Sequence, residues 1–140
     1  MTVEGGVVKV FTRPDHPEYT SFVYLGQYAN SYGILDMKGG SLTSSDSNGL
    51  QIGWQGSGEA NISGGTATFD RVRLGSGSAT TTKTNRLVQT GGVLNVNYYD
   101  AAYGINASEV AERTGLVQLD GGVTKCGRFN GGLGDRKSVV

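Results

Sequence analysis

The sequence predicts an all-β fold, specifically a parallel β-solenoid segment of about five coils. Five diglycines recur along the 140 residues at intervals of about 25 to 34 residues, and periods of this size are typical of stacked repeats. Residues on both sides of each diglycine alternate between apolar and polar, which is the period of a strand with one buried face. The five pairs are Gly5-Gly6, Gly39-Gly40, Gly64-Gly65, Gly91-Gly92 and Gly121-Gly122.

Alignment of the chain on its diglycines shows which side chains would face the interior. The second residue before each pair is predicted to point inward: Val3, Met37, Ile62, Gln89 and Leu119. The second and fourth residues after each pair are mostly apolar as well, and Cys126 takes the last of these positions. We therefore expect Cys126 to be a small buried hydrophobe, and a single cysteine permits no internal disulfide.

A second strand-like block follows each of the first four diglycines and ends in another glycine. These blocks are 23–26, 50–53, 72–75 and, more weakly, 101–104. Glycine reaches positive φ without a steric clash, so both glycine positions suit sharp corners. Two strands and two corners describe one coil of a solenoid, and coils must stack to bury their inward faces. The segment 106–114 is the only helix-like stretch, and we expect it to be an insertion between coils.

Composition and charge exclude several classes of partner. Twelve Lys and Arg balance twelve Asp and Glu, and no basic cluster interrupts the sequence. Nucleic-acid binding is therefore not expected, and no apolar run is long enough for membrane insertion within this segment. Glycine makes up 24 of the 140 residues, far more than the share of roughly 7% in globular domains. This excess favours a repetitive structure in which the main partners are neighbouring coils of the same chain.

We expect residues 1–134 to be β-solenoid repeats of a longer protein, because Val3 already occupies an inward position close to the first residue. Residues 135–140 (DRKSVV) match the translation of a common short-read sequencing adapter. We interpret them as an artefact at the end of a metagenomic fragment, outside the fold. A segment cut at both ends would expose unpaired strand edges. We therefore expect it to aggregate or to stack end to end when expressed alone.

The stretch 52–65 (IGWQGSGEANISGG) carries the motif I-G-x-x-G-x-G-x-x-x-I-S-G-G. This motif resembles the glycine-rich repeats of autotransporter passenger segments and of large exported bacterial proteins with a PEP-CTERM sorting signal. The resemblance covers nearly all of residues 3–134. It implies a right-handed β-helix at the extracellular or outer-membrane surface of a Gram-negative bacterium, with a role in adhesion or in the cell-surface matrix.

Four residues are candidates for carbohydrate contact. Aromatic side chains stack on sugar rings, and Trp54, Tyr98 and Tyr99 are predicted to lie at corners or in loops, away from the inward positions. Asp100 follows the two tyrosines and adds a hydrogen-bond acceptor. This interpretation makes carbohydrate a candidate partner. The alternative is that these tyrosines only cover the edges of coils.

No residue is assigned to catalysis, to a cofactor or to a metal. Asp15, His16 and Glu18 stand together, but two adjacent prolines favour a solvated loop, and known metal-binding spacings are absent. Parallel β-helices also support polysaccharide lyases and hydrolases, and hydrolysis needs two carboxylates at a defined separation. The residues that would have to converge for such chemistry are Asp70, Arg71, Arg73, Asp100 and Asp120. We favour scattered, solvated charges over that arrangement.

The function predicted from these observations is that of a non-catalytic structural stalk or adhesin segment of a large exported bacterial surface protein. Two alternatives stay open. One is part of a β-helix polysaccharide lyase or hydrolase, in which acidic and basic side chains would meet in one cleft. The other is a phage tailspike, which would be a trimer.

Overall fold

The computed structural model describes residues 1–10, 22–75, 84–100 and 115–130. Every regular element in these ranges is a β-strand, so the predicted all-β class is confirmed. Accordingly, these ranges hold no helix of the length and apolarity that a membrane crossing requires. Four predictions concern residues outside them: the strand block 101–104, the helix-like segment 106–114, the loop around His16 and the segment 135–140.

The strands follow one another with a diglycine corner inside each pair, as the sequence predicts. In chain order they are β1 (Thr2–Val3), β2 (Val7–Val10), β3 (Val23–Leu25), β4 (Tyr32–Met37), β5 (Ser41–Ile52), β6 (Ser57–Ile62), β7 (Thr66–Leu74), β8 (Asn85–Gln89), β9 (Val93–Asp100), β10 (Gly115–Leu119) and β11 (Val123–Asn130). Diglycine corners join β1 to β2, β4 to β5, β6 to β7, β8 to β9 and β10 to β11.

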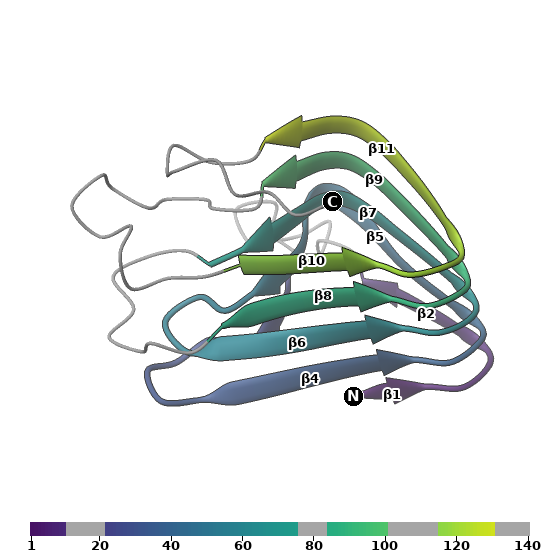
Figure 1. Cartoon of the computed structure of the whole chain (residues 1–140). Helices are drawn as coiled ribbons and strands as arrows, with labels where there is room; N and C mark the ends of the chain where they lie inside the picture. Colours follow the sequence, from purple (N-terminus) through teal and green to yellow (C-terminus); the bar gives the residue numbers. More distant parts are fainter. Residues whose placement is uncertain (11–21, 76–83, 101–114, 131–140) are drawn as a thin grey trace, which may run out of the picture.

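These strands form two parallel sheets that face each other across the core (Figure 1). Sheet A has the order β1-β4-β6-β8-β10, and sheet B has the order β11-β9-β7-β5-β2 with β3 paired to β5. Equivalent residues of successive coils are paired in register; Met37, for example, lies beside Val3 on one side and Ile62 on the other. Each coil is therefore one repeat of the sequence.

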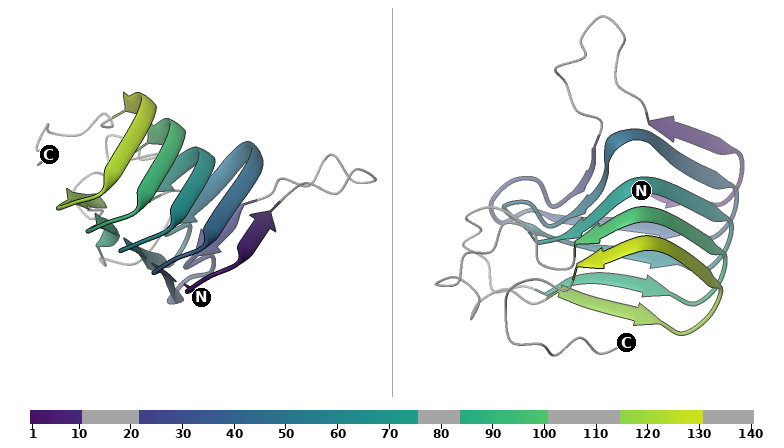
Figure 2. Two further views of the ribbon diagram at one scale, coloured as in Figure 1. Left: turned by 90° about the vertical axis from the view of Figure 1, so that its right-hand side faces the viewer. Right: turned by 90° about the horizontal axis from the view of Figure 1, so that it is seen from above.

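The chain winds as a right-handed coil, which both views of Figure 2 show. This handedness is the one that parallel crossover connections adopt in nearly all proteins. Among the described strands, the three inner pairs β4/β5, β6/β7 and β8/β9 have neighbours on both sides, whereas the first and last pairs have a neighbour on one side only. The described residues thus complete about 3 turns of the solenoid, slightly fewer than the five coils predicted.

Both kinds of glycine corner have the left-handed backbone that the sequence predicts. The second glycine of every pair has a positive φ, and so do Gly26, Gly53 and Gly75 at the ends of the second strand blocks. At Gly65, where φ is 75°, an added Cβ would lie 2.6 Å from the carbonyl oxygen of Gly40. Stacked corners therefore pack backbone against backbone, and only glycine fits there.

The strands of sheet B bend midway and give each coil a third side. The pairing of β5 with β7 is irregular between Ser44 and Gly49, and in β7 the consecutive residues Asp70 and Arg71 both lie outside the core. Figure 2 shows the resulting curve. Beyond the bend Val72 and Leu74 point into the core, and Arg73 between them points outward but is also buried. We call the outer surface of β3, and of the parts of β5, β7, β9 and β11 beyond the bend, the third face.

The core consists of ladders of inward side chains, one from each coil. Most of the predicted inward positions are buried: Val3, Met37, Leu42, Ile62, Ala67, Phe69, Gln89, Leu94 and Val96. Full burial of a side chain such as Ile62 contributes about 1.5–3 kcal/mol. The last coil departs from the prediction, because Leu119 is 46% exposed and Cys126 is exposed. Cys126 is in register with Val96, but no further described strand covers it.

Two buried amides hold neighbouring coils together. The side-chain nitrogen of Gln89 donates to the carbonyl oxygen of Val123 at 3.2 Å, and the hydroxyl of Thr124 donates to its amide oxygen. Asn85 accepts a hydrogen bond from the backbone nitrogen of Gly58 at 3.0 Å. Buried polar groups are costly unless they are satisfied, so these bonds explain how two amides are accommodated inside the solenoid.

Candidate ligand-binding face

The third face brings arginine and aromatic side chains into two outward rows that run across the coils. In the first row, Arg71 of β7 is in register with Tyr98 of β9, which is in register with Arg128 of β11. In the second row, two residues further along the strands, the in-register residues are Tyr24, Gln51, Arg73 and Asp100. Two of the four predicted carbohydrate-contact residues, Tyr98 and Asp100, therefore lie on this face.

An aromatic cluster occupies the end of the third face nearest the first coil. The ring centroids of Phe22 and Tyr24 are 5.2 Å apart, and Trp54 meets Tyr24 edge to face at 6.2 Å. All three rings are partly exposed. Trp54 directly follows the corner at Gly53, as predicted, and its ring lies against Tyr24 of the preceding coil.

Arg73 links this aromatic cluster to Asp100. Its guanidinium carbon lies 5.3 Å from the centre of the Phe22 ring, and its Nε lies 3.8 Å from a carboxylate oxygen of Asp100. The residue is only 7% exposed, so its charge depends on this carboxylate and on the ring face. Burial raises the pKa of the nearby Tyr24 hydroxyl, and the positive charge of Arg73 partly opposes that rise.

Tyr98 is the most accessible aromatic residue on the described part of β9. Its side chain is 43% exposed, and the guanidinium carbon of Arg71 lies 5.4 Å from the centre of its ring. Arg128 lies in register on the other side, in the neighbouring strand, and is exposed. Tyr98 therefore stands between two arginines in a row that runs across three coils.

The predicted position of Tyr99 is wrong. Successive residues of a strand point to opposite sides, so Tyr98 and Tyr99 cannot present both rings to one ligand. Tyr99 points inward, is 4% exposed, and stacks on Phe129 with ring centroids 5.2 Å apart. Burial raises the pKa of its hydroxyl well above 10, and Cys126 raises it further. Tyr99 is a core residue, and its stacking supports the strand that carries Tyr98.

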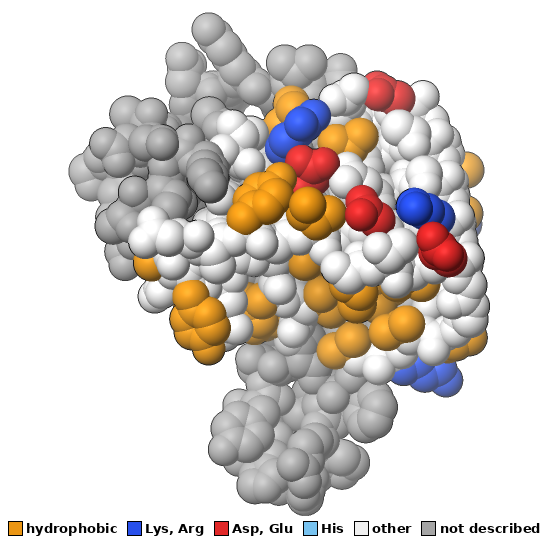
Figure 3. Space-filling model, turned by 90° about the horizontal axis from the view of Figure 1, so that it is seen from below, with side chains coloured by type: hydrophobic (Ala, Val, Ile, Leu, Met, Phe, Trp, Pro, Cys, Tyr) orange, Lys and Arg blue, Asp and Glu red, His pale blue; other side chains and the backbone are white. Residues whose placement is uncertain are grey.

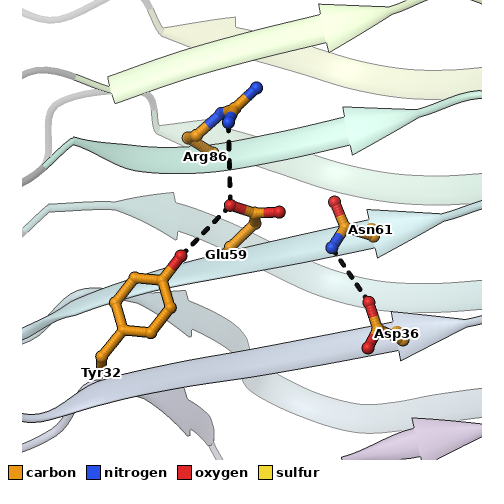
Figure 4. Close-up of polar contacts among 5 residues, drawn as sticks. All are labelled: Tyr32, Asp36, Glu59, Asn61 and Arg86. Carbon is orange, nitrogen blue, oxygen red and sulfur yellow. Dashed lines mark hydrogen bonds and ion pairs between the residues drawn. The ribbon is translucent and has the colours of Figure 1, made fainter.

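The outer surface of sheet A carries a second polar cluster, which Figure 4 shows. The hydroxyl of Tyr32 donates to a carboxylate oxygen of Glu59 at 3.2 Å, and Arg86 approaches the same oxygen at 3.8 Å. Two residues further along β6, Asn61 donates to Asp36 at 2.9 Å. Burial is the main cause that raises the pKa of Tyr32, and the Glu59 carboxylate adds to it.

This second cluster was not predicted from the sequence, although its signal was present. Every residue in it occupies an outward position of a sheet-A strand, directly before an inward position. Aligned on the diglycines, Asp36 and Asn61 fall in the same column, which predicts a contact between adjacent coils. The contact of Tyr32 with Glu59 is diagonal, so alignment by column does not reveal it.

Of the charged residues considered for polysaccharide chemistry, Arg71, Arg73 and Asp100 share the third face, but the three carboxylates do not converge. Asp70 accepts a hydrogen bond from Asn97 at 2.8 Å at the bend, and Asp100 pairs with Arg73 beyond it. Asp120 lies before β11, at the opposite end of that strand from the position in register with Asp100. Among the described residues, no group of three or more His, Cys, Asp or Glu is placed to hold a metal ion.

Charge is distributed unevenly between the outer surfaces. The acidic residues along the sheet-A strands and their corners are Glu4, Asp36, Glu59 and Asp120, with Lys38 and Arg86 beside them. From below, where β1 and β4 lie nearest, Figure 3 shows acidic and basic side chains next to one another. On the third face, by contrast, Arg73 pairs with Asp100, while Arg71 and Arg128 pair with no carboxylate among the described residues, and Asp70 lies beside Arg71 at the bend. The third face is therefore the described surface most suited to an anionic ligand.

The chain matches no protein-family model, no curated protein and no solved structure. Fold and surface chemistry define it as a parallel β-solenoid with an arginine- and tyrosine-bearing third face.

Proposed function

We propose that this segment is a non-catalytic structural stalk or adhesin segment of a large exported bacterial surface protein. The observation that carries the proposal is the direction of the polar contacts. Most charged and amide side chains with a described partner reach that partner in the adjacent coil. The pairs are Lys38 with Glu4, Asn61 with Asp36, Arg86 with Glu59, Arg73 with Asp100, and Asn97 with Asp70.

Contacts of this kind support stacking. An exposed ion pair contributes only about 0–1 kcal/mol to stability, so these pairs add little energy each. Like-charge neighbours across strands are unfavourable, however, and matched pairs favour the correct register of coil upon coil. Together with the apolar ladders of the core, they suit a rigid rod that holds other parts of a protein away from a surface.

The proposal is tested with three measurements on the same purified chain. A stalk segment should resist proteases up to its melting temperature, because a coil must open before its backbone enters a protease site. It should also release no reducing or unsaturated sugar ends from a panel of polysaccharides. Light scattering supplies the third result, and a stable trimer there would contradict the stalk and favour the tailspike.

A part of a polysaccharide hydrolase remains the second candidate, and one observation favours it. Glu59 and Asp36 place two carboxylates on the outer surface of adjacent sheet-A strands, with Tyr32 and Arg86 in contact with Glu59 (Figure 4). Two carboxylates flanking a glycosidic bond are the minimum for hydrolysis. Sugar release that disappears in Glu59→Gln while the protein stays folded would replace the stalk proposal with this one.

A further inference from the structure

We propose that the third face binds an acidic polysaccharide at Tyr98, with Arg71 and Arg128 as the groups that hold its carboxylates. This inference goes beyond the structural role, since a solenoid needs no ligand in order to act as a stalk. It rests on the arrangement of three side chains from three successive coils.

The Tyr98 ring is accessible to a ligand. Arg71 covers part of it, with 5.4 Å between the guanidinium carbon and the ring centre, yet the residue remains 43% exposed. Its strand is held on the core side by Tyr99, which is buried and stacked on Phe129. A half-exposed aromatic ring on a rigid strand is a platform on which the apolar side of a sugar can stack with little loss of entropy.

Positive charge lies on either side of that ring, at Arg71 and Arg128. Within the described residues, neither Arg71 nor Arg128 forms an ion pair, whereas Arg73 and Arg86 both pair with carboxylates. Arg71 and Arg128 lie one strand to each side of Tyr98, so their backbones are about 9.6 Å apart at two strand spacings. A guanidinium binds a carboxylate through two parallel hydrogen bonds. The pair is therefore suited to a sugar that carries a carboxylate.

An acidic glycan and a nucleic acid both combine negative charge with rings, so the local charge has to distinguish them. A nucleic-acid surface needs a broad basic field. This chain has a formal net charge of zero, and Asp100 lies two residues from Tyr98 on the same face. A short site for one or two carboxylated sugars fits this local charge better than a phosphate backbone does.

The test measures binding of the full chain to polygalacturonate and, as a matched neutral polymer, to fully methyl-esterified polygalacturonate. We expect the acidic polymer to bind at low salt and to weaken as salt rises, while the ester binds at least about tenfold more weakly, since charge-assisted hydrogen bonds are lost. Equal binding of the two polymers, or no binding of either, would overturn the proposal.

Variants locate the site. Arg71→Gln, Arg128→Gln and Tyr98→Ala should each weaken binding of the acidic polymer by about tenfold, and Tyr98→Phe should restore most of it because the ring is kept. Lys9→Gln and Tyr28→Ala remove an exposed charge and an exposed ring elsewhere and should bind like the parent. Circular dichroism of each variant separates a lost site from a lost fold.

Two further outcomes count against the proposal. One is a loss of binding in Lys9→Gln as large as that in Arg71→Gln, which would mean that only overall charge matters. The other is competition by single-stranded DNA at an affinity equal to that of polygalacturonate, with the same variants affected, which would make the face a nucleic-acid site.

Discussion

Tyr99 occupies a position on the inner side of β9 where the preceding coils hold Val72 and Leu50. Its ring is well placed, since it stacks on Phe129. Its hydroxyl is less so, because it is buried and has no hydrogen-bond partner among the described residues. A buried polar atom in this state costs about 1–3 kcal/mol relative to a satisfied one. The residue therefore combines favourable packing with an unsatisfied polar atom.

Replacement of that hydroxyl gives a prediction with two parts. At neutral pH, Tyr99→Phe should raise the free energy of unfolding by about 1 kcal/mol, because the ring is kept and the unsatisfied atom is removed. The advantage should then grow above pH 10. There the unfolded chain loses the phenol proton, whereas the folded chain, in which burial raises the pKa of Tyr99, keeps it. The stability of the parent therefore falls as pH rises towards the folded pKa.

The measurement is denaturant unfolding of both proteins between pH 7 and the alkaline limit of the fold. The difference between them should widen by up to about 1.4 kcal/mol per pH unit above pH 10. Tyr98→Phe is the control, because it removes a hydroxyl from an exposed ring on the same strand. A constant difference across the whole range would show that Tyr99 is not buried as described.

At the level of strands and corners, most of the fold was predictable because the glycines mark it directly. All five diglycine corners and the corners at Gly26, Gly53 and Gly75 have the expected backbone. The bend in sheet B was not predicted, since Asp70 and Arg71 break the alternation with no glycine between them. That bend moves Tyr99 inward and places Tyr98 and Asp100 on the third face, so the sequence alone identified those two residues but not the surface they share.

Burial in the last coil was unpredictable for a different reason. Cys126 and Leu119 stand in the correct columns, but a column becomes a buried ladder only where another coil covers it. The contacts that define the candidate site also depend on that stacking. The pairing of Arg71 with Tyr98 joins residues 27 positions apart along the chain, and only the register of β7 with β9 brings them together.

Diglycine corners give a prediction in which conformation and crowding can be separated. Gly65→Ala should cost more than Gly6→Ala, although both have φ near 75°. At Gly65 an added Cβ would collide with the backbone of Gly39 and Gly40, whereas at Gly6 nothing lies within 4 Å. The conformational cost alone is about 1–3 kcal/mol, and the collision adds to it at Gly65.

Thermal and denaturant unfolding of the two variants, together with Gly5→Ala, test this order. Gly5 has no positive φ and an added Cβ there would meet nothing within 4 Å, so its replacement should be nearly neutral. Equal losses at Gly65 and Gly6 would mean that the corners do not pack against each other.

At the scale of the whole molecule, the first and last described coils carry like charges at equivalent positions. The register runs from Lys9 through the inner coils to Lys125, and from Val7 to Val123. Glu4 and Asp120 likewise precede the first and last diglycines. If a second copy continued the solenoid head to tail, Lys9 would meet Lys125 and Glu4 would meet Asp120. Like charges directly opposite each other across strands are unfavourable.

End-to-end association of this chain should therefore depend on salt in an unusual direction. At low ionic strength the two like-charge contacts oppose the stacking expected from the open strand edges, so light scattering should report smaller species there than at high salt. Raising the salt shortens the Debye length from about 10 Å at 0.1 M to about 3 Å at 1 M, so the exposed apolar side chains Val7 and Val123 can then associate. Lys125→Glu combined with Asp120→Lys should reverse this behaviour, because both end contacts become attractive. That variant should form longer rods at low salt and dissociate as salt rises, and a parent chain that instead dissociates with salt would show that its ends meet in some other arrangement.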